Sequence, residues 1–318
     1  MRRNKKLTTD IHSLKLATFF VVSLLCLLLV SFVLKGIVLI SKSKFDGDHR
    51  FTLEIKRKNT KNNAQKKSVA IISLEPRSQT ASIVYLPFGA PAAPLSRFLE
   101  IPIDAAVSIP SMDGDILDEL WQKKDALTSI DIAGVFVKLL ISIRQEDSSL
   151  TVIDLARLAY LSRNIPGNRI KFQSVSEQLL EGEIDRMSSL LFSDSVIGKE
   201  NITIQIINGT DMSGLGNRLA RFITNMGGSV VAISTSKQAE SHSRIVHRNK
   251  NSYSLRKLSA ALGFEVVAVP VPTPTLSIGV SPILLEGGGE SSIEKKEDTY
   301  ISDIIITIGK DSIGHLVF

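Results

Sequence analysis

A glycine-rich turn is the stretch whose residue types and spacing come nearest to a site for chemistry. Residues 204–223 have the sequence IQIINGTDMSGLGNRLARFI, in which an apolar run ends at a turn and helical spacing follows. A strand that leads through such a turn into a helix exposes the free N–H groups of the helix start, which favour anions such as phosphate. The candidate contacts to an anion or other ligand are Asn208, Gly209, Thr210, Ser213, Gly214 and Gly216.

The turn does not carry a nucleotide-binding motif. It lacks the Gly-Lys-Ser/Thr of a Walker loop, its glycines do not have the G-x-G-x-x-G spacing, and no acidic residue closes the next strand. A structural role explains the same residues: Asn208 and Gly209 tolerate positive φ, Ser213 caps the helix, and Gly216 lets the helix pack close to the sheet. We therefore predict a strand-to-helix turn, with an anion or glycan contact as the alternative.

The remaining reactive side chains do not form a recognisable set. His242 and His247 are five positions apart, so in a strand they point to opposite faces and a metal site would need further ligands. Cys26 is the single cysteine, which excludes a disulfide within the chain. No Ser/His/Asp or Cys/His arrangement and no HExxH motif is present. We predict no catalytic residue, no metal site and no cofactor.

An apolar segment near the N-terminus is long enough to cross a membrane. Residues 16–34 contain no charged side chain, and 19 helical residues span roughly 28 Å, about the thickness of a bilayer core. The basic excess is larger before this segment than after it, which places the N-terminus in the cytoplasm and the bulk of the chain outside. A cleaved signal peptide is the alternative, although the apolar region is long and no small-x-small cleavage site follows it.

The rest of the 318-residue chain has the composition of a globular protein, with 43% hydrophobic residues, 22% charged residues and a net charge of +6. The predicted fold class is α/β: an N-terminal transmembrane helix followed by two α/β sandwich-type domains. The predicted divisions are a cytoplasmic tail at 1–15, a transmembrane helix at 16–40, a first domain at 46–176, a linker at 177–201, and a second domain at 202–312 with a mobile loop at 270–300.

Local patterns place the elements of the two domains. In the first, alternating apolar residues predict strands at 51–55, 68–76 and 81–87, with a hairpin between the last two. A capping box of Thr151 and Asp154 predicts the start of a helix that ends before Pro166. In the second domain strands alternate with helices, which indicates βαβ units. The basic run at 56–67 suits a solvated loop, or a segment that docks on anionic headgroups or polymers.

The second domain resembles the LytR C-terminal domain of bacterial envelope proteins in the LytR/CpsA/Psr family. The resemblance rests on residues 204–231, 243–267 and 303–311, where a strand ends in Asn-Gly, a helix ends near glycine, and a last strand ends in Gly-x-Asp. The first domain looks like a degenerate form of the family's own catalytic domain, through residues 69–87, 95–110 and 150–172. The resemblance implies a cell-membrane location with the bulk of the protein extracytoplasmic.

The resemblance also points to an activity of the family, but the charged residues that this activity requires are replaced in this chain. Active members are thought to transfer an anionic glycopolymer from a lipid pyrophosphate to peptidoglycan, using arginines and Mg²⁺-binding carboxylates. Where the family has Pro-Arg-Asp this chain has Pro87-Phe88-Gly89, and near the other charged motif it has Gln65, Lys66 and Lys67. The segment 121–150 is too short for the later arginine-rich stretch. Because a pyrophosphate needs cations to balance it, these replacements argue against transfer.

Three hypotheses follow for the function. The favoured one is a membrane-anchored, non-catalytic binding or scaffolding protein of the cell envelope, with peptidoglycan, an anionic wall polymer or other envelope proteins as partners. The second is a divergent glycopolymer phosphotransferase that uses Lys66, Lys67 and Arg97. The third is a regulator that acts through protein contacts; its cytoplasmic tail is too short for a DNA-binding domain, so nucleic acid is not an expected partner.

Overall fold

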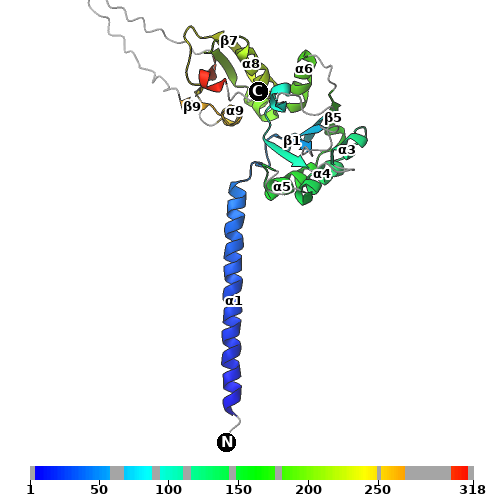
Figure 1. Ribbon diagram of the computed structural model, residues 1–318, viewed down its shortest axis with the longest axis vertical. Helices are drawn as coiled ribbons and strands as arrows, with labels where there is room; N and C mark the ends of the chain where they lie inside the picture. Colours follow the sequence, from blue (N-terminus) through cyan, green and yellow to red (C-terminus); the bar gives the residue numbers. More distant parts are fainter. Residues whose placement is uncertain are drawn as a thin grey trace, which may run out of the picture.

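A computed structural model shows how these predicted elements are arranged (Figure 1). The structure describes residues 4–57, 68–87, 94–109, 116–142, 148–175, 181–248, 252–268 and 302–313, with side chains from residue 15 onward except that of Glu181. The predicted loop at 270–300 and most of the basic run at 56–67 lie outside the described residues.

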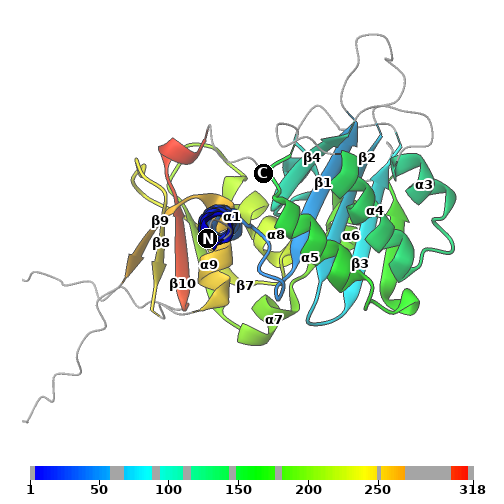
Figure 2. The same ribbon diagram turned by 90° about the horizontal axis from the view of Figure 1, so that it is seen from below.

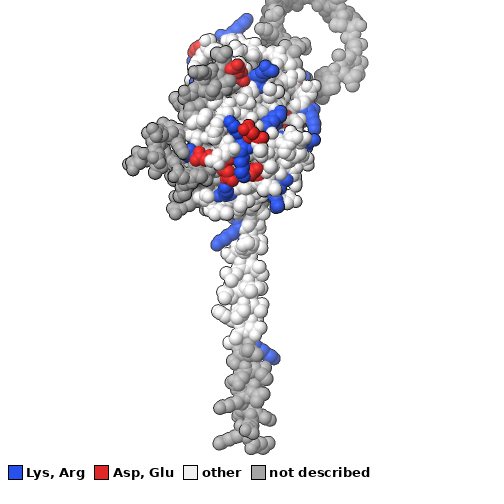
Figure 3. Space-filling view, turned by 90° about the vertical axis from the view of Figure 1, so that its right-hand side faces the viewer, with Lys and Arg blue, Asp and Glu red and all other residues white. Residues whose placement is uncertain are grey.

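Helix α1 (Asn4–Ser41) stands apart from the rest of the protein. Its segment Lys15–Ser41 is long and apolar enough to cross a membrane, and none of its most apolar stretch is buried against the protein. Figure 3 shows that its described surface is nearly free of charge, whereas cations and anions are interspersed on the folded part above it. A long helix without protein neighbours is unfavourable in water, so α1 fits a membrane anchor.

The first unit is built on a five-stranded mixed sheet. Its strands are β1 (Phe51–Arg57), β2 (Val69–Glu75), β3 (Thr80–Leu86), β4 (Ala105–Ile109) and β5 (Ile170–Ser174). The order is β4-β1-β2-β3-β5, with the three central strands antiparallel and both edge strands parallel to their neighbours. The predicted hairpin between β2 and β3 is confirmed, and it turns through residues 76–79.

Helices cover both faces of this sheet. The helices are α2 (Leu95–Leu99), α3 (Ile116–Gln122), α4 (Ser129–Ser142), α5 (Val152–Ser162) and α6 (Glu181–Phe192), with a short 3-10 turn η2 (Gly167–Arg169). One hydrophobic core lies between the sheet and the layer of α3, α4 and α5. The other lies between the opposite face and α2 with α6. Alternating strand residues supply the two cores, so the first unit has three layers.

The predicted start of α5 is confirmed by its hydrogen bonds. The Thr151 hydroxyl accepts from the N–H of Asp154, and the Asp154 carboxylate accepts from the N–H of Thr151 at 2.8 Å. This reciprocal capping box satisfies two N–H groups that the helix itself cannot pair.

The second unit is a two-layer arrangement. Its strands are β6 (Thr203–Asn208), β7 (Ser229–Thr235), β8 (Arg244–His247), β9 (Glu265–Ala268) and β10 (Ile304–Ile308), in the order β7-β6-β10-β8-β9. Only the pair β8 and β10 is antiparallel. The helices are α7 (Ser195–Glu200), α8 (Leu215–Asn225) and α9 (Tyr253–Leu262), with a 3-10 turn η3 (Lys310–Ser312) after β10. The α/β fold class predicted from the sequence is confirmed.

The two units lie side by side above α1, as Figure 2 shows in a view from below. Residues 42–50, here called the stem segment, connect α1 to β1 between them. Phe45 of the stem segment is 1% exposed and belongs to the core of the first unit. The segment 177–201, predicted to be a linker, contains α6, which packs in the first unit, and α7, whose Ile197 packs in the second.

Candidate functional site

The glycine-rich turn uses its polar groups to hold itself together. The Asn208 side chain accepts from the N–H and the hydroxyl of Thr210, at 3.1 and 2.8 Å, and donates to the carbonyl of Met212 at 2.8 Å. Asn208 and Thr210 are both buried. The Asn208 amide therefore clamps the loop that leads from β6 into α8.

Two local predictions for this turn are wrong. Neither Asn208 nor Gly209 has a positive φ, and the left-handed residue is Gly214, with φ of 82°. Gly214 is also the N-cap of α8, so Ser213 does not cap the helix. The left-handed conformation falls at Gly214, immediately before the helix, where the lack of a Cβ allows it. Gly209 is needed for another reason: an added Cβ would lie 2.8 Å from the carbonyl oxygen of Ile308.

The close packing predicted at Gly216 is confirmed. An added Cβ there would lie 3.0 Å from Cγ2 of Ile233, on the neighbouring strand β7. Of the six candidate ligand residues, Ser213 and Gly214 are exposed to solvent and the other four are buried. Contact of this turn with an anion stays a prediction.

The two histidines have different surroundings. His247 is buried on the helix-covered face of the second sheet, whereas the His242 side chain is 84% exposed beside Asp311. Among the described residues, no group of three or more His, Cys, Asp or Glu side chains could hold a metal ion.

Several residues that the sequence comparison singled out are not described. Phe88, Gly89, Gln65, Lys66 and Lys67 lie outside the described residues. Arg97, the other cation considered for a divergent transferase, is exposed on α2.

A cavity of about 330 Å³ lies between the two units. The stem segment contributes Lys44 to its wall, the first unit contributes Ser96 and residues 101–104, and the second unit contributes Phe222, Lys257, Ala260 and Ala261. We call this space the inter-unit cavity. Most of its wall is apolar, and its polar groups are two ammonium groups, one carboxylate and one hydroxyl.

One cation in the inter-unit cavity is paired, and the other has no partner among the described residues. Lys257 donates to Asp104 at 2.6 Å, and the other oxygen of Asp104 accepts from the N–H of Thr52 at 2.8 Å. Lys44 is exposed and makes no ion pair or hydrogen bond with any described side chain. A negatively charged group that enters this cavity would therefore meet one ammonium group without a competing carboxylate.

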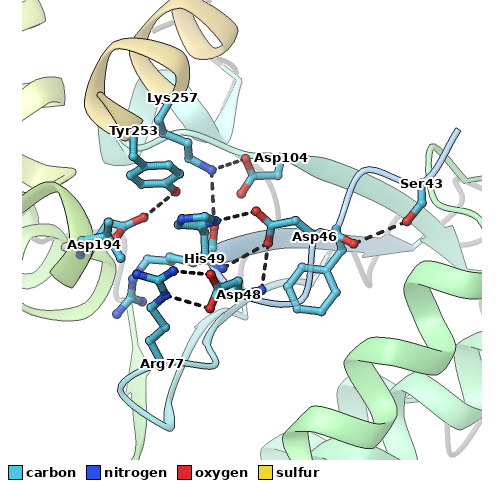
Figure 4. A network of polar contacts seen from close by, with 12 residues as sticks. Ser43, Asp46, Asp48, His49, Arg77, Asp104, Asp194, Tyr253 and Lys257 are labelled. Atoms are coloured by element: carbon cyan, nitrogen blue, oxygen red, sulfur yellow. Dashed lines mark hydrogen bonds and ion pairs between the residues drawn. The ribbon is translucent and has the colours of Figure 1, made fainter. Parts of the chain in front are cut away.

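A stacked pair of rings joins the stem segment to the second unit beside this cavity (Figure 4). The His49 ring of the stem segment lies against Tyr253 of α9, with ring centroids 3.9 Å apart and planes inclined by 11°. The Tyr253 hydroxyl donates to Asp194 at 2.8 Å, and His49 Nδ1 is 2.5 Å from Asp46 Oδ2. The stem segment is thus joined to the second unit through side chains from three separate stretches of the chain.

The surroundings shift the pKa values of this network in opposite directions. Burial, followed by the charge of Asp194, raises the pKa of Tyr253 far above its ordinary value, so its hydroxyl stays a donor. Burial disfavours the ionised Asp46 carboxyl, but the N–H groups of Asp48 and His49 outweigh it. The pKa of Asp46 therefore lies below its ordinary value.

A buried ion pair extends the contact between the units. Arg50 of the stem segment donates to Glu75 at 2.7 Å and to the carbonyl of Leu191 at 2.9 Å. The second oxygen of Glu75 accepts from the N–H of Ser195, the first residue of α7, at 2.8 Å. Burial alone would raise the pKa of Glu75, but the charge of Arg50 and the donors from Ser195 hold it below its ordinary value.

A second ion pair joins α2 to α8. Glu100, in a left-handed conformation with φ of 49°, accepts two hydrogen bonds from Arg221, at 2.7 and 2.8 Å, and one from Arg218 at 3.3 Å. Asn225 donates to the carbonyl oxygen of Glu100 at 3.1 Å. A bidentate arginine fixes orientation as well as distance, so this contact restrains how α8 lies against the end of α2.

These contacts form a joint between the stem segment and the two units, beside the inter-unit cavity. The carboxylate of Asp104 is engaged by Lys257 and by a backbone N–H, which leaves it poorly placed to accept a proton from a substrate. None of these residues was a candidate from the sequence, because the partners Asp104 and Lys257 are separated by 153 positions and no local pattern relates them.

A family model described as "LytR cell envelope-related transcriptional attenuator" matches residues 201–311, which correspond to the second unit. This unit is a LytR C-terminal domain, as the sequence resemblance predicted. A search of curated proteins finds no match to the chain.

Solved structures show only distant likeness. The transcriptional regulator yvhJ from Bacillus subtilis is 13% identical, with 41% of this chain and 83% of that chain covered and a TM-score of 0.28. Bacillus subtilis TagV is 11% identical, covering 43% and 87%, also with a TM-score of 0.28. A structure of TagT bound to LIIa-WTA is 12% identical, covering 69% and 93%, with a TM-score of 0.19. Similarity at this level carries no argument about the activity of this chain.

Proposed function

We propose that the protein is a membrane-anchored, extracytoplasmic component of the cell envelope that binds an acidic wall polymer and does not catalyse its transfer. The proposal combines a domain of a cell envelope-related family at 201–311 with a helix able to cross a membrane at its N-terminal end. An acidic polymer is chosen as the ligand because repeated anionic groups suit a cavity whose Lys44 ammonium group has no partner among the described residues.

The observation that carries the proposal is the placement of Lys44. This residue lies three positions after the end of α1 and faces the cavity between the units without a described partner. A ligand bound there would be held next to the membrane by both units together. The side chains around it supply binding charge, and the described wall offers no carboxylate free to act as a general base.

Binding can be measured with the full chain in detergent micelles and purified peptidoglycan that either carries or lacks its acidic polymer. We expect retention on the polymer-bearing wall only. Charge reversal in Lys44→Glu should weaken retention by about threefold to tenfold, which corresponds to one exposed ionic contact. Lys171→Glu is the matched control, because Lys171 is an exposed lysine of β5 that does not line the cavity.

Two results would count against the proposal. Equal retention on both wall preparations would exclude the acidic polymer as the ligand. Release of polymer from a lipid pyrophosphate carrier, followed by its appearance on peptidoglycan, would support the divergent phosphotransferase instead.

A further inference from the structure

The outer surface of α4 and α5 exposes large apolar side chains. On α4 these are Ile130, Val137 and Ile141, of which Ile130 is 75% and Ile141 80% exposed. On α5 they are Val152 and Tyr160, the latter 68% exposed. Their spacings of seven and four on α4, and of eight on α5, place each set along one side of its helix. We call this surface the α4–α5 face.

The α4–α5 face points toward the membrane end of the molecule. The opposite sides of both helices pack on the first sheet through Phe136, Leu139, Leu155 and Leu158. Seen from below, α4 and α5 lie in front of that sheet (Figure 2), and seen from the side they lie beneath it, with α5 level with the last turns of α1 (Figure 1). The exposed sides of the two helices therefore face the direction in which α1 runs.

Hydrogen bonds hold α5 next to the end of α1. Asp154 of α5 accepts from the hydroxyl of Ser43 at 2.6 Å and from the N–H of Phe45 at 2.9 Å. Arg157 of α5 donates to the carbonyl of Phe45 at 3.0 Å. Because α1 ends at Ser41, these contacts begin two residues beyond it, and they leave little freedom for the first unit to move away from the membrane.

The charges around the α4–α5 face suit lipid headgroups. Lys42, just beyond α1, and Arg163, at the end of α5, are exposed and form no ion pair with described residues. Within α4 and α5 as described, the two carboxylates are both occupied, because Asp131 pairs with Lys123 and Asp154 is buried in the capping box. An apolar surface with a tyrosine and peripheral cations is the composition that favours the interface between headgroups and acyl chains.

We propose that the α4–α5 face is a membrane-contact surface that seats the first unit in the headgroup layer of the bilayer that α1 enters. This inference rests on the membrane anchoring in the proposed function. It names the lipid surface as the partner, since the face is continuous with the anchor and carries no exposed unpaired carboxylate within the two helices. Seating fixes the height of the inter-unit cavity above the membrane.

The test uses the full chain in nanodiscs of phosphatidylcholine and phosphatidylglycerol. A nitroxide label is placed at Ile141→Cys or Tyr160→Cys in a Cys26→Ser background, and its collisions with oxygen and with an aqueous nickel chelate are compared. A label in the headgroup and acyl boundary should show an oxygen-to-nickel collision ratio about threefold or more above that of a label in water. The control is Gln173→Cys, which is exposed on the opposite face of the same sheet.

A label on the native cysteine tests the proposed membrane anchor separately from the membrane contact of the α4–α5 face. Cys26 lies within α1 and is labelled in the otherwise unchanged chain. If Cys26 reports lipid while Ile141 and Tyr160 report water like Gln173, the anchor stands and the seating is overturned. If Cys26 also reports water, both the anchor and the seating are overturned.

Two further measurements test whether the label itself has changed the protein. Val137→Cys provides a third labelled position on the same face, and each variant must retain the thermal unfolding midpoint of the parent chain. A second copy of the chain could cover the α4–α5 face instead of lipid. Dipolar broadening between labels at Ile141, with low access to both oxygen and nickel, would show such a dimer and overturn the seating.

Discussion

The hydroxyl of Ser43 donates a 2.6 Å hydrogen bond to the carboxylate of Asp154, 111 positions further along the chain. The same carboxylate closes the capping box of α5 and accepts from the N–H of Phe45. One buried side chain therefore completes the capping box of α5 and fixes the stem segment to that helix. The orientation of the first unit relative to α1 depends on this residue.

Replacement of Asp154 by alanine should destabilise the first unit strongly. The change removes the side-chain acceptor that Asp154 supplies to the capping box and leaves the buried N–H of Phe45 without its acceptor, for a loss of about 2–4 kcal/mol in the free energy of unfolding. Denaturant unfolding of the full chain in micelles, followed by the fluorescence of Trp121, measures the loss. Asp125→Ala, at an exposed turn, is the control and should change the free energy little. Equal stability of both variants would contradict this role of Asp154.

Acid should weaken the joint between the stem segment and the two units. The pKa values of Asp154, Glu75 and Asp46 lie below the ordinary values of 3.8 for Asp and 4.5 for Glu. A carboxyl with a lowered folded-state pKa adds stability at pH values above its unfolded pKa, and this stability is lost as the pH falls through the folded-state pKa. We expect the free energy of unfolding to be constant near neutral pH and to fall below about pH 4.5.

The variant Glu75→Gln measures how much of the loss of stability in acid comes from the ion pair between Glu75 and Arg50. The variant should be less stable at pH 7, because Arg50 is then buried without a negative partner. Its free energy of unfolding should depend less on pH between 3 and 5 than that of the parent chain. A pH profile parallel to the parent would exclude a contribution from Glu75.

The features that were predicted from the sequence are those determined by neighbouring residues. The contacts that were missed are between residues that lie far apart in the sequence and meet only in the folded protein. The capping box of Thr151 and Asp154 lies within one turn of helix, and the hairpin between β2 and β3 is determined by the short turn that connects two apolar runs. The contact of Glu100 with Arg221 joins residues 121 positions apart, and each is an ordinary surface charge in its local sequence. Such pairs depend on the packing of whole units, which periodicity does not encode.

Alkaline pH should lower the stability of the folded protein by ionising Tyr253 in the unfolded chain. Its folded-state pKa is raised, so its contribution to stability is complete below the unfolded value near 10 and is lost as the pH rises above it. Tyr253→Phe keeps the ring that stacks on His49 and removes the hydrogen bond to Asp194, at a cost of about 1.5–3 kcal/mol at pH 7. The variant should also lose part of the decline in stability between pH 9 and pH 11. Tyr160→Phe is the exposed control, and an identical profile for both variants would contradict the prediction.

Glu100→Asn should open the contact between the units without disturbing the backbone. Asparagine tolerates the left-handed conformation better than most residues, so the loss comes mainly from the carboxylate that holds Arg218 and Arg221. Because both arginines are partly exposed, we expect a cost of about 1–2 kcal/mol, or an increase of roughly fivefold to thirtyfold in the open fraction. Proteolysis in the segment 193–202 under native conditions measures opening. Glu265→Asn, an exposed position on β9, should leave the cleavage rate unchanged.

Three glycine-to-alanine variants distinguish close packing from backbone strain. Gly209→Ala places a methyl group 2.8 Å from a backbone oxygen that β10 holds in place, so we expect a loss of about 1–3 kcal/mol. Gly214→Ala meets no atom within 4 Å but must keep φ of 82°, at a cost of about 1–2 kcal/mol. Gly134→Ala lies in the middle of α4 with open space around its Cβ position, and it should stabilise the protein by about 0.5–1 kcal/mol. The order of the three unfolding midpoints is the measurement, and a stabilised Gly209→Ala would show that the carbonyl of Ile308 does not crowd this position.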